Sequence, residues 1–372
     1  MTDQLENDGI EKPDDDGARE VQILSPTPRR VLIAVAIALG VVLVALVVLL
    51  LWFLGRPQDL TSMAPVRGVQ AVWQVYGPGK GETPLFGRPM GVAAGPNGRI
   101  YVTDATNNRV CVFDSRGRFL FEFGGFGIAK PPAGGQVTYE PGRLNYPVGI
   151  DIDADGNVYV ASFYNDSIEV YEPDGDPIRR IPDPTVQTGR SGSGSGGTGI
   201  AVTDVAVFGD RLYATDAYQV FVFSLTGEVL DQWGQPGSPD YDLDHPNGIA
   251  VGRDGTVYVS DSNHNRVVAY SPEGELLWQV GTTSGGIADQ AIHELELPRG
   301  LTVMPDDSIL VCDAFGFELV RISPSGEVLG RYGERGVEPA QFNFTNDVEV
   351  LRDSLVIADR ANGRVQMVRL LD

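Results

Sequence analysis

Short apolar runs separated by glycine, asparagine and aspartate recur along most of the chain. Six stretches repeat one pattern of 13 or 14 residues: an apolar strand, a tight turn, and a second apolar strand ending in Asp or Ser. They are 91–104, 149–162, 204–216, 248–261, 300–313 and 347–359. Their starting points lie 44 to 58 residues apart. Repeats of this period built from short strands are typical of β-propellers, in which each blade covers the face of the next.

Each unit predicts four strands rather than two. In the fourth unit, apolar runs at 248–251, 256–261, 266–271 and 276–281 have the length and alternation of pleated strands. Asp254-Gly255 and Glu273-Gly274 lie between these runs, where a tight turn favours glycine. The pattern predicts an all-β fold, a six-bladed β-propeller.

The two ends of the repeat region complement each other. The sixth unit ends at residue 372 after its third strand. Residues 69–77 read as a fourth strand that no first three strands precede. We therefore expect 69–77 to complete the sixth blade and to remove the open edges of the ring. The propeller domain is predicted to cover residues 69–372.

A separate apolar segment precedes the repeats. Residues 31–54 carry no charge over 24 positions, enough for about 36 Å of helix against a hydrocarbon core of about 30 Å. We interpret this segment as an uncleaved signal anchor. Arg29 and Arg30 precede it, which predicts a cytoplasmic N-terminus and an extracytoplasmic propeller at the cell membrane. Residues 1–30 are expected to be a disordered acidic tail, and residues 55–68 a tether.

Charge and cysteine content narrow the possible partners. Of the net charge of −22, residues 1–30 contribute −4 and residues 31–68 contribute +1, leaving −19 for residues 69–372. A domain of this sign lacks the basic surface that nucleic-acid binding requires, so we expect no nucleic-acid partner. Cys111 and Cys312 belong to the first and fifth units, which do not adjoin in a ring of six, and are expected to be buried thiols.

One face of the predicted disc is suited to recognition. Turns after first and third strands are short, whereas the connections after second and fourth strands vary and lie on the opposite face. Aromatic residues gather in or beside these connections, and we expect them to contact a protein, peptide or glycan. The binding candidates are Phe163, Tyr164, Tyr218, Phe315 and Phe317, with Tyr139, Tyr146 and Tyr241 in the same loops. Residues 189–199, rich in Gly and Ser, are expected to be a flexible spacer.

Recurring motifs resemble NHL repeats over residues 69–372. They are Pro-x-Gly before the first strand, Tyr-Val-x-Asp in the second, and Asp-x-x-Asn-x-Arg-Val at 104–110, 261–267 and 359–365. The resemblance implies a six-bladed propeller, but related propellers include binding scaffolds, lyases and lactonases. Because the motif Asp recurs, we expect it to tie the loop after the second strand to backbone donors, with Arg109, Arg266 and Arg364 as charge partners. The recurring residues are Asp104, Asp216, Asp261, Asp313 and Asp359.

The entries to the innermost strands offer candidate chemistry at the central channel. The polar residues there, expected as channel-mouth binding candidates, are Asp204, Asn247, Arg299, Asn346 and Asp347. In the related peptide-amidating lyases, histidines at such entries bind zinc. Here His245, His264 and His293 occupy unlike repeat positions, which disfavours a zinc site.

The Asn and Asp side chains leave a calcium-dependent, lactonase-like hydrolase open as an alternative, with Ca²⁺ in the channel. A zinc-dependent lyase is the less favoured alternative. The sequence favours a binding module over an enzyme, without an assigned catalytic residue, metal site or resident cofactor.

Overall fold

A computed structural model of the chain describes residues 26–54, 56–128, 140–181, 201–234, 242–281 and 295–371. The expected acidic tail and the Gly/Ser-rich spacer fall mainly or wholly outside these ranges. The chain divides into two units near Leu50. The first unit contains most of α1 (Pro26–Leu54). Residues 29–54 of α1 are long and apolar enough to cross a membrane, and no other helix in the described part of the chain is.

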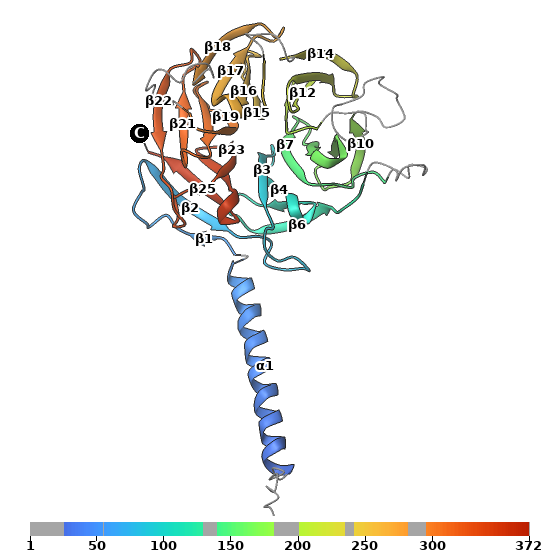
Figure 1. Ribbon diagram of the computed structural model, residues 1–372, viewed down its shortest axis with the longest axis vertical. Helices are drawn as coiled ribbons and strands as arrows, with labels where there is room; N and C mark the ends of the chain where they lie inside the picture. The colour runs from blue at the N-terminus through green and yellow to red at the C-terminus, as the bar shows by residue number, and fades with distance from the viewer. Residues whose placement is uncertain are drawn as a thin grey trace, which may run out of the picture. The chain divides into compact units, whose positions relative to one another are not determined.

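The second unit is the six-bladed propeller that the repeats predict (Figure 1). The first blade comprises β3 (Pro89–Ala94), β4 (Ile100–Asp104), β5 (Arg109–Phe113) and β6 (Phe119–Gly124), and the second comprises β7 (Pro147–Ile152), β8 (Val158–Ser162), β9 (Ser167–Tyr171) and β10 (Pro177–Ile181). The third comprises β11 (Asp204–Phe208), β12 (Arg211–Thr215), β13 (Val220–Ser224) and β14 (Val229–Trp233), and the fourth comprises β15 (Pro246–Val251), β16 (Val257–Asp261), β17 (Arg266–Tyr270) and β18 (Leu276–Gly281). The fifth comprises β19 (Pro298–Val303), β20 (Ile309–Asp313), β21 (Glu318–Ile322) and β22 (Val328–Tyr332); the sixth contains β23 (Thr345–Leu351), β24 (Ser354–Asp359) and β25 (Arg364–Leu370).

The first strands of the blades surround the central channel. Each contacts the first strand of the next blade, in the order β3, β7, β11, β15, β19 and β23, and β23 contacts β3 again. Apolar side chains from facing sheets fill the space between adjacent blades, as in the cluster that joins Tyr213, Trp233 and Tyr270 of blades three and four. The core is therefore a ring of interfaces, so that each blade is stabilised by both of its neighbours.

The predicted closure of the ring is confirmed. β2 (Val69–Val75) pairs antiparallel with β25, and Trp73 lies opposite Met367. Within the segment expected to be a tether, β1 (Gln58–Asp59) pairs with β2 and gives the sixth blade a fifth strand. Leu60, directly after β1, is buried in the core between blades five and six. Cys111 and Cys312 are free and buried, as expected.

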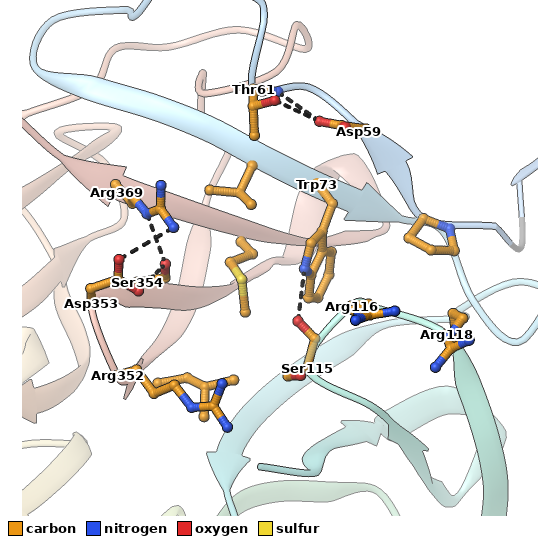
Figure 2. A pocket seen from close by; sticks show the side chains of 14 residues that line it. Asp59, Thr61, Trp73, Ser115, Arg116, Arg118, Arg352, Asp353, Ser354 and Arg369 are labelled. Atoms are coloured by element: carbon orange, nitrogen blue, oxygen red, sulfur yellow. Dashed lines mark hydrogen bonds and ion pairs between the residues drawn. The ribbon is translucent and has the colours of Figure 1, made fainter.

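A tryptophan spans the junction between the closing blade and the first blade. Trp73 on β2 is buried, and its indole Nε1 donates to the carbonyl oxygen of Ser115 at 3.3 Å, as Figure 2 shows. Trp278 makes the corresponding contact between blades four and five, donating to the carbonyl oxygen of Pro324 at 2.8 Å. The same hydrogen bond from a tryptophan to a turn carbonyl joins both pairs of blades, but only Trp73 lies on the closing strand β2.

We expect Trp73→Ala to lower the free energy of unfolding by about 3–5 kcal/mol, because it leaves a cavity beside the closing strand. Trp278→Ala, at a more exposed site on a fourth strand that belongs to its own blade's continuous stretch, is the matched control and should cost less. Urea unfolding followed by circular dichroism measures both. Equal losses in the two variants would show that the contact of the closing strand stabilises the fold no more than the contact between blades four and five.

Candidate functional site

In most blades the polar residue at the end of the second strand holds the loop that enters the same blade; in blade three Asp216 instead accepts from Tyr218 N and Gln219 N in the loop that follows it. Asp104 Oδ1 accepts hydrogen bonds from the backbone N–H of Gly87 and Arg88 at 2.8 and 2.9 Å. Its Oδ2 accepts from Arg109 Nε at 3.0 Å. The structural role of the Asp and its pairing with the motif Arg are confirmed. The loop held by the backbone bonds of Asp104 precedes the first strand, however, whereas the loop after the second strand was expected.

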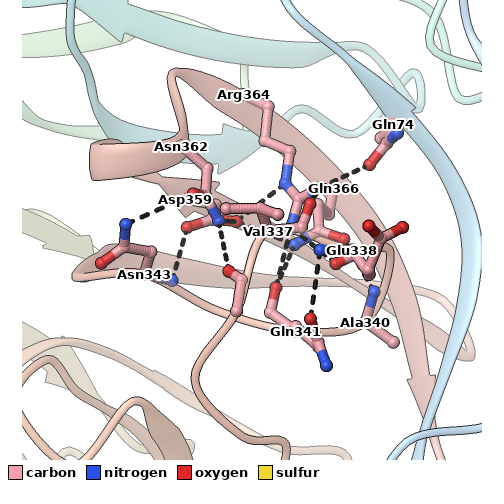
Figure 3. A network of polar contacts seen from close by, with 11 residues as sticks. Gln74, Val337, Glu338, Ala340, Gln341, Asn343, Asp359, Asn362, Arg364 and Gln366 are labelled. Atoms are coloured by element: carbon pink, nitrogen blue, oxygen red, sulfur yellow. Dashed lines mark hydrogen bonds and ion pairs between the residues drawn. The ribbon is translucent and has the colours of Figure 1, made fainter.

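The sixth blade shows the complete network (Figure 3). Asp359 Oδ1 accepts from Asn343 N at 2.9 Å and Oδ2 from Arg364 Nε at 2.8 Å. Arg364 also donates to Gln74 Oε1 on β2 at 2.9 Å and to the carbonyl oxygen of Glu338 at 2.9 Å. This fully buried arginine links the closing strand to the loop before β23.

The same bonds position a set of side chains at the channel mouth. Asp261 accepts from Asp244 N at 2.8 Å, and in the second blade, where Ser162 replaces the usual Asp, Ser162 Oγ accepts from Asn145 N at 2.9 Å. Each anchored residue is followed directly by a residue at the first-strand entry. In three blades that residue is not glycine and has positive φ, namely Tyr146 (59°), His245 (52°) and Phe344 (56°).

Left-handed backbone is unfavourable for such residues and is maintained only where the surroundings enforce it, often at functional sites. Each of the three contacts another aromatic ring from the loop face. Tyr164 lies 5.3 Å from Tyr146 between ring centroids, and Tyr218 lies 5.7 Å from His245. Phe315 lies 5.3 Å from Phe344.

The structure thus brings four of the five predicted loop-face aromatics to the mouth. Phe163 packs 5.1 Å from Tyr164 and also against the core between blades two and three, so it is partly structural. Phe317 lies apart from these three groups, under the guanidinium of Arg335 at 4.7 Å. Tyr139, Tyr241 and His293 fall outside the described residues.

Three arginines converge on the same rings. Arg88 Nη1 donates to Tyr146 Oη at 2.7 Å. The guanidinium carbons of Arg299 and Arg360 lie 5.6 and 4.7 Å from the centroid of Phe344. Within the described part of the chain, none of the three arginines forms an ion pair with a carboxylate.

Arg299 is the least satisfied of the three. Its Nη2 donates to Asn247 Oδ1 at 3.2 Å, but its buried Nε has no hydrogen-bond partner among the described residues. Burial and the nearby charge of Arg360 lower the pKa of Arg299 to about 10. Burial also lowers the pKa of Arg360, and the charge of Arg88 adds to this. A half-buried guanidinium whose Nε is fully buried and unpartnered favours an anion at this place.

The remaining channel-mouth candidates connect neighbouring blades. Asn247 Oδ1 accepts from Arg299 Nη2 of blade five, and Asn346 Nδ2 donates to the carbonyl oxygen of Met90 in blade one at 3.0 Å. Asp204 accepts from Ile249 N at 3.0 Å and Asp347 from Val92 N at 2.9 Å, each reaching the first strand of the next blade. Their first role is therefore to hold the ring together.

Two further carboxylates share the channel with these aspartates. Asp151 and Glu349 line a cavity of about 200 Å³ with Asp204 and Asp347. Burial raises the pKa of Asp151 to about 6 and that of Glu349 to about 8, and it holds the pKa of Asp204 and of Asp347 well above the usual range. Mutual repulsion adds to the burial effect.

These carboxylates fit a resident calcium ion poorly. The oxygens of Asp151, Asp204 and Asp347 are already directed at backbone N–H groups, and Glu349 accepts from Thr302 Oγ1 at 3.2 Å. No group of three or more His, Cys, Asp and Glu side chains with metal-binding geometry occurs among the described residues. The observed role of these acids is to tie neighbouring blades together.

Sequence reasoning did not select Arg88, Arg360, Asp151 or Glu349. Arg88 lies one position before the Pro of the first-strand motif, a position that aligns with Tyr146 and His245 across the repeats. Asp151 and Glu349 lie two positions beyond Gly149 and Asp347, and alternate residues of a strand share a face. Alignment of the repeats by strand face would have identified both groups.

The channel acids predict a pH-dependent stability. A carboxyl whose folded pKa exceeds its unfolded value stabilises the fold below the unfolded pKa, and this contribution declines as pH rises toward the folded pKa. For Glu349 the window runs from its ordinary 4.5 to about 8. We expect Glu349→Gln to flatten the decline across that window, with a gain on the order of 2 kcal/mol near pH 8.

Urea unfolding at several pH values measures this effect. The exposed Glu228→Gln is the charge-matched control and should leave the slope unchanged. An unchanged slope in Glu349→Gln would contradict the assignment.

Comparisons with known proteins agree with the fold. The NHL repeat model matches residues 86–113 and 243–270, so the chain carries NHL repeats. Peptidyl-glycine alpha-amidating monooxygenase B of Xenopus laevis is 28% identical over 196 residues, covering 50% of this chain and 21% of that protein. NHL repeat-containing protein 3 of Homo sapiens is 28% identical over 162 residues, covering 40% of this chain and 44% of that protein. The chain thus spans less than half the length of these curated relatives.

Solved structures with the same architecture include enzymes. Virginiamycin B lyase from Staphylococcus aureus superposes with a TM-score of 0.52 at 13% identity, covering 85% of this chain and 99% of that one. A gluconolactonase from Xanthomonas campestris superposes with a TM-score of 0.52 at 16% identity, covering 85% of this chain and 94% of that one. At these identities the likeness shows the fold alone.

Proposed function

We propose that this NHL-repeat propeller is a membrane-tethered, extracytoplasmic binding module that captures a protein, peptide or glycan at its channel mouth. The observation that carries the proposal is the convergence of Arg88, Arg299 and Arg360 on an aromatic rim without carboxylate partners, in a domain of net charge −19. Such a site favours a ligand that carries a carboxylate, sulfate or phosphate group.

The aromatic rim supplies the second part of the interaction. Tyr164, Tyr218 and Phe315 are exposed beside the residues that enter the blades, and rigid aromatic side chains are effective anchors at interfaces. Their arrangement around the arginines suits a ligand with an anionic group flanked by apolar or sugar-ring surface. The acidic remainder of the domain would repel anions elsewhere and so direct them to the mouth.

The tether in this proposal is α1. Its length and apolar composition suit a membrane span, and the preceding Arg29 and Arg30 favour a cytoplasmic N-terminus. A propeller placed outside the cytoplasm in this way would present its binding face to extracellular or periplasmic ligands.

A hydrolase or lyase is the less favoured alternative. The channel aspartates accept from backbone N–H groups of neighbouring blades, and Asn247 Oδ1 accepts from Arg299; among the described residues Asn346 Oδ1 alone of these oxygens has no partner. An enzyme of the calcium-dependent type would need those oxygens for the ion. Addition of Ca²⁺ should therefore leave the melting temperature of the protein unchanged, and a saturable increase would favour the alternative.

We expect the full-length protein to bind acidic members of a peptide and glycan array in preference to amidated or neutral ones. Arg299→Gln should weaken binding about 10-fold or more, since a charge-assisted hydrogen bond contributes about 1.5–3 kcal/mol. Arg211→Gln is the control, because Arg211 is exposed at the start of β12, away from the mouth. Equal binding of neutral and acidic members, or equal loss in both variants, would contradict the proposed site.

A further inference from the structure

A pocket of about 550 Å³ lies at the junction between blades six and one, where the ring is closed (Figure 2). Trp73 and Met367 form its apolar wall, while the β5–β6 turn and the β23–β24 turn contribute polar side chains. The pocket is lined only by residues of the propeller unit. Its volume falls in the range typical of small-ligand sites.

Four arginines and two aspartates line this pocket. They are Arg116, Arg118, Arg352, Arg369, Asp59 and Asp353. Arg369 pairs with Asp353 at 3.2 Å, and Arg118 pairs with Asp114 outside the lining at 2.6 Å. The side chains of Arg116 and Arg352 form neither a hydrogen bond nor an ion pair with any described residue. Two guanidinium groups are thus available for a ligand.

Comparison among the repeats shows that these cations are specific to the closure. The residue after the turn glycine that joins third and fourth strands is acidic in four blades, as Asp176, Glu228, Glu275 and Glu327, but is Arg118 in the first blade. The residue before that glycine is Arg116 in the first blade, whereas in the other four it is acidic or a hydroxyl residue. The turn between third and fourth strands therefore carries two arginines in blade one alone, and both of them line the pocket.

Arg352 occupies a position that the fold favours for glycine. The turn between first and second strands has a residue with positive φ in every blade. This residue is Gly98, Gly156, Gly209, Gly255 and Asp307 in the first five blades, and in the sixth it is Arg352, with φ 61°. Arginine in left-handed backbone is less stable than glycine. A strained residue whose side chain lines a pocket suggests that the side chain is retained for binding.

The chain itself ties this pocket to the end of the apolar helix. Pro57 and Asp59 line the pocket, and α1 ends at Leu54. Three residues of extended chain span at most about 11 Å. Where α1 crosses a membrane, the pocket therefore lies within reach of the lipid headgroups.

We propose that the pocket at the blade six–blade one junction binds the phosphate of an anionic phospholipid headgroup. Arg116 and Arg352 contact the phosphate oxygens, for which the planar guanidinium is well suited, while Trp73 and Met367 cover the glycerol. The proposal rests on the membrane tether proposed above, but it concerns a different site from the channel mouth.

The test uses the full-length protein in detergent, titrated with short-chain phosphatidylglycerol or phosphatidylcholine and followed by native mass spectrometry. We expect phosphatidylglycerol to be retained about 10-fold more strongly than phosphatidylcholine, because the choline ammonium of the latter places a positive charge beside the two arginines. The double variant Arg116→Gln, Arg352→Gly should abolish this preference. Arg253→Gln removes one exposed arginine from the corresponding turn of blade four and should leave it intact. Equal retention of both lipids, or an unchanged preference in the double variant, would overturn the proposal.

Two further arms separate the possible causes of failure. Arg352→Gly alone should raise the melting temperature while it weakens phosphatidylglycerol binding, so a loss of binding with a lowered melting temperature would count against a binding role. Inorganic phosphate and glycerol phosphate should compete only weakly, and competition as strong as that of the lipid would overturn the lipid as the source of the phosphate.

Alkaline carbonate extraction of membranes containing the protein tests the tether itself. Release of the protein would refute both the tether and the lipid site. Retention combined with equal binding of the two lipids would refute the lipid site alone.

Discussion

The antiparallel pairing of β2 with β25 is the constraint on which the rest of the molecule depends. Every other blade is a continuous stretch of four strands, whereas the sixth is completed by a segment from the other end of the domain. Without this pairing, β25 and the neighbouring face of blade one would be exposed, and the first strands would no longer form a closed ring. Both the channel mouth and the pocket at the junction exist only in the closed form.

A second layer of order comes from the residue that ends each second strand. Asp104, Asp261 and Asp359, with Ser162 in the second blade, bond the loop that leads into the same blade. A repeated structural motif thereby fixes the backbone beside residues that differ from blade to blade. The repeated bonds hold the backbone in one arrangement while the side chains beside it vary between blades. In this way one fold can serve unrelated functions.

The blade number, the strand order and the closure could be predicted from the sequence, because the repeats carry their turn glycines and apolar alternation at matching positions. That the motif Asp has a structural role was also predictable from its recurrence, but the loop that it holds was not, because that loop precedes the blade instead of following the second strand. The arginines of the mouth were less accessible, because Arg88, Arg299 and Arg360 come from three repeats and from different positions within them. Their convergence depends on the curvature of the ring. The raised pKa values of the channel acids likewise depend on burial, which strand pattern alone does not determine. β1 was missed because two residues give no periodicity.

The short pairing of β1 with β2 has a mechanical consequence. The chain between the apolar helix and the closing strand passes through β1, whose two residues pair only with β2. Tension between an anchored helix and a captured ligand would load this two-residue ladder before it reached the longer β2–β25 ladder. β1 would detach from β2 first and lengthen the connection between the helix and the propeller. The tension would then fall before the β2–β25 pairing opened, and the propeller would remain closed.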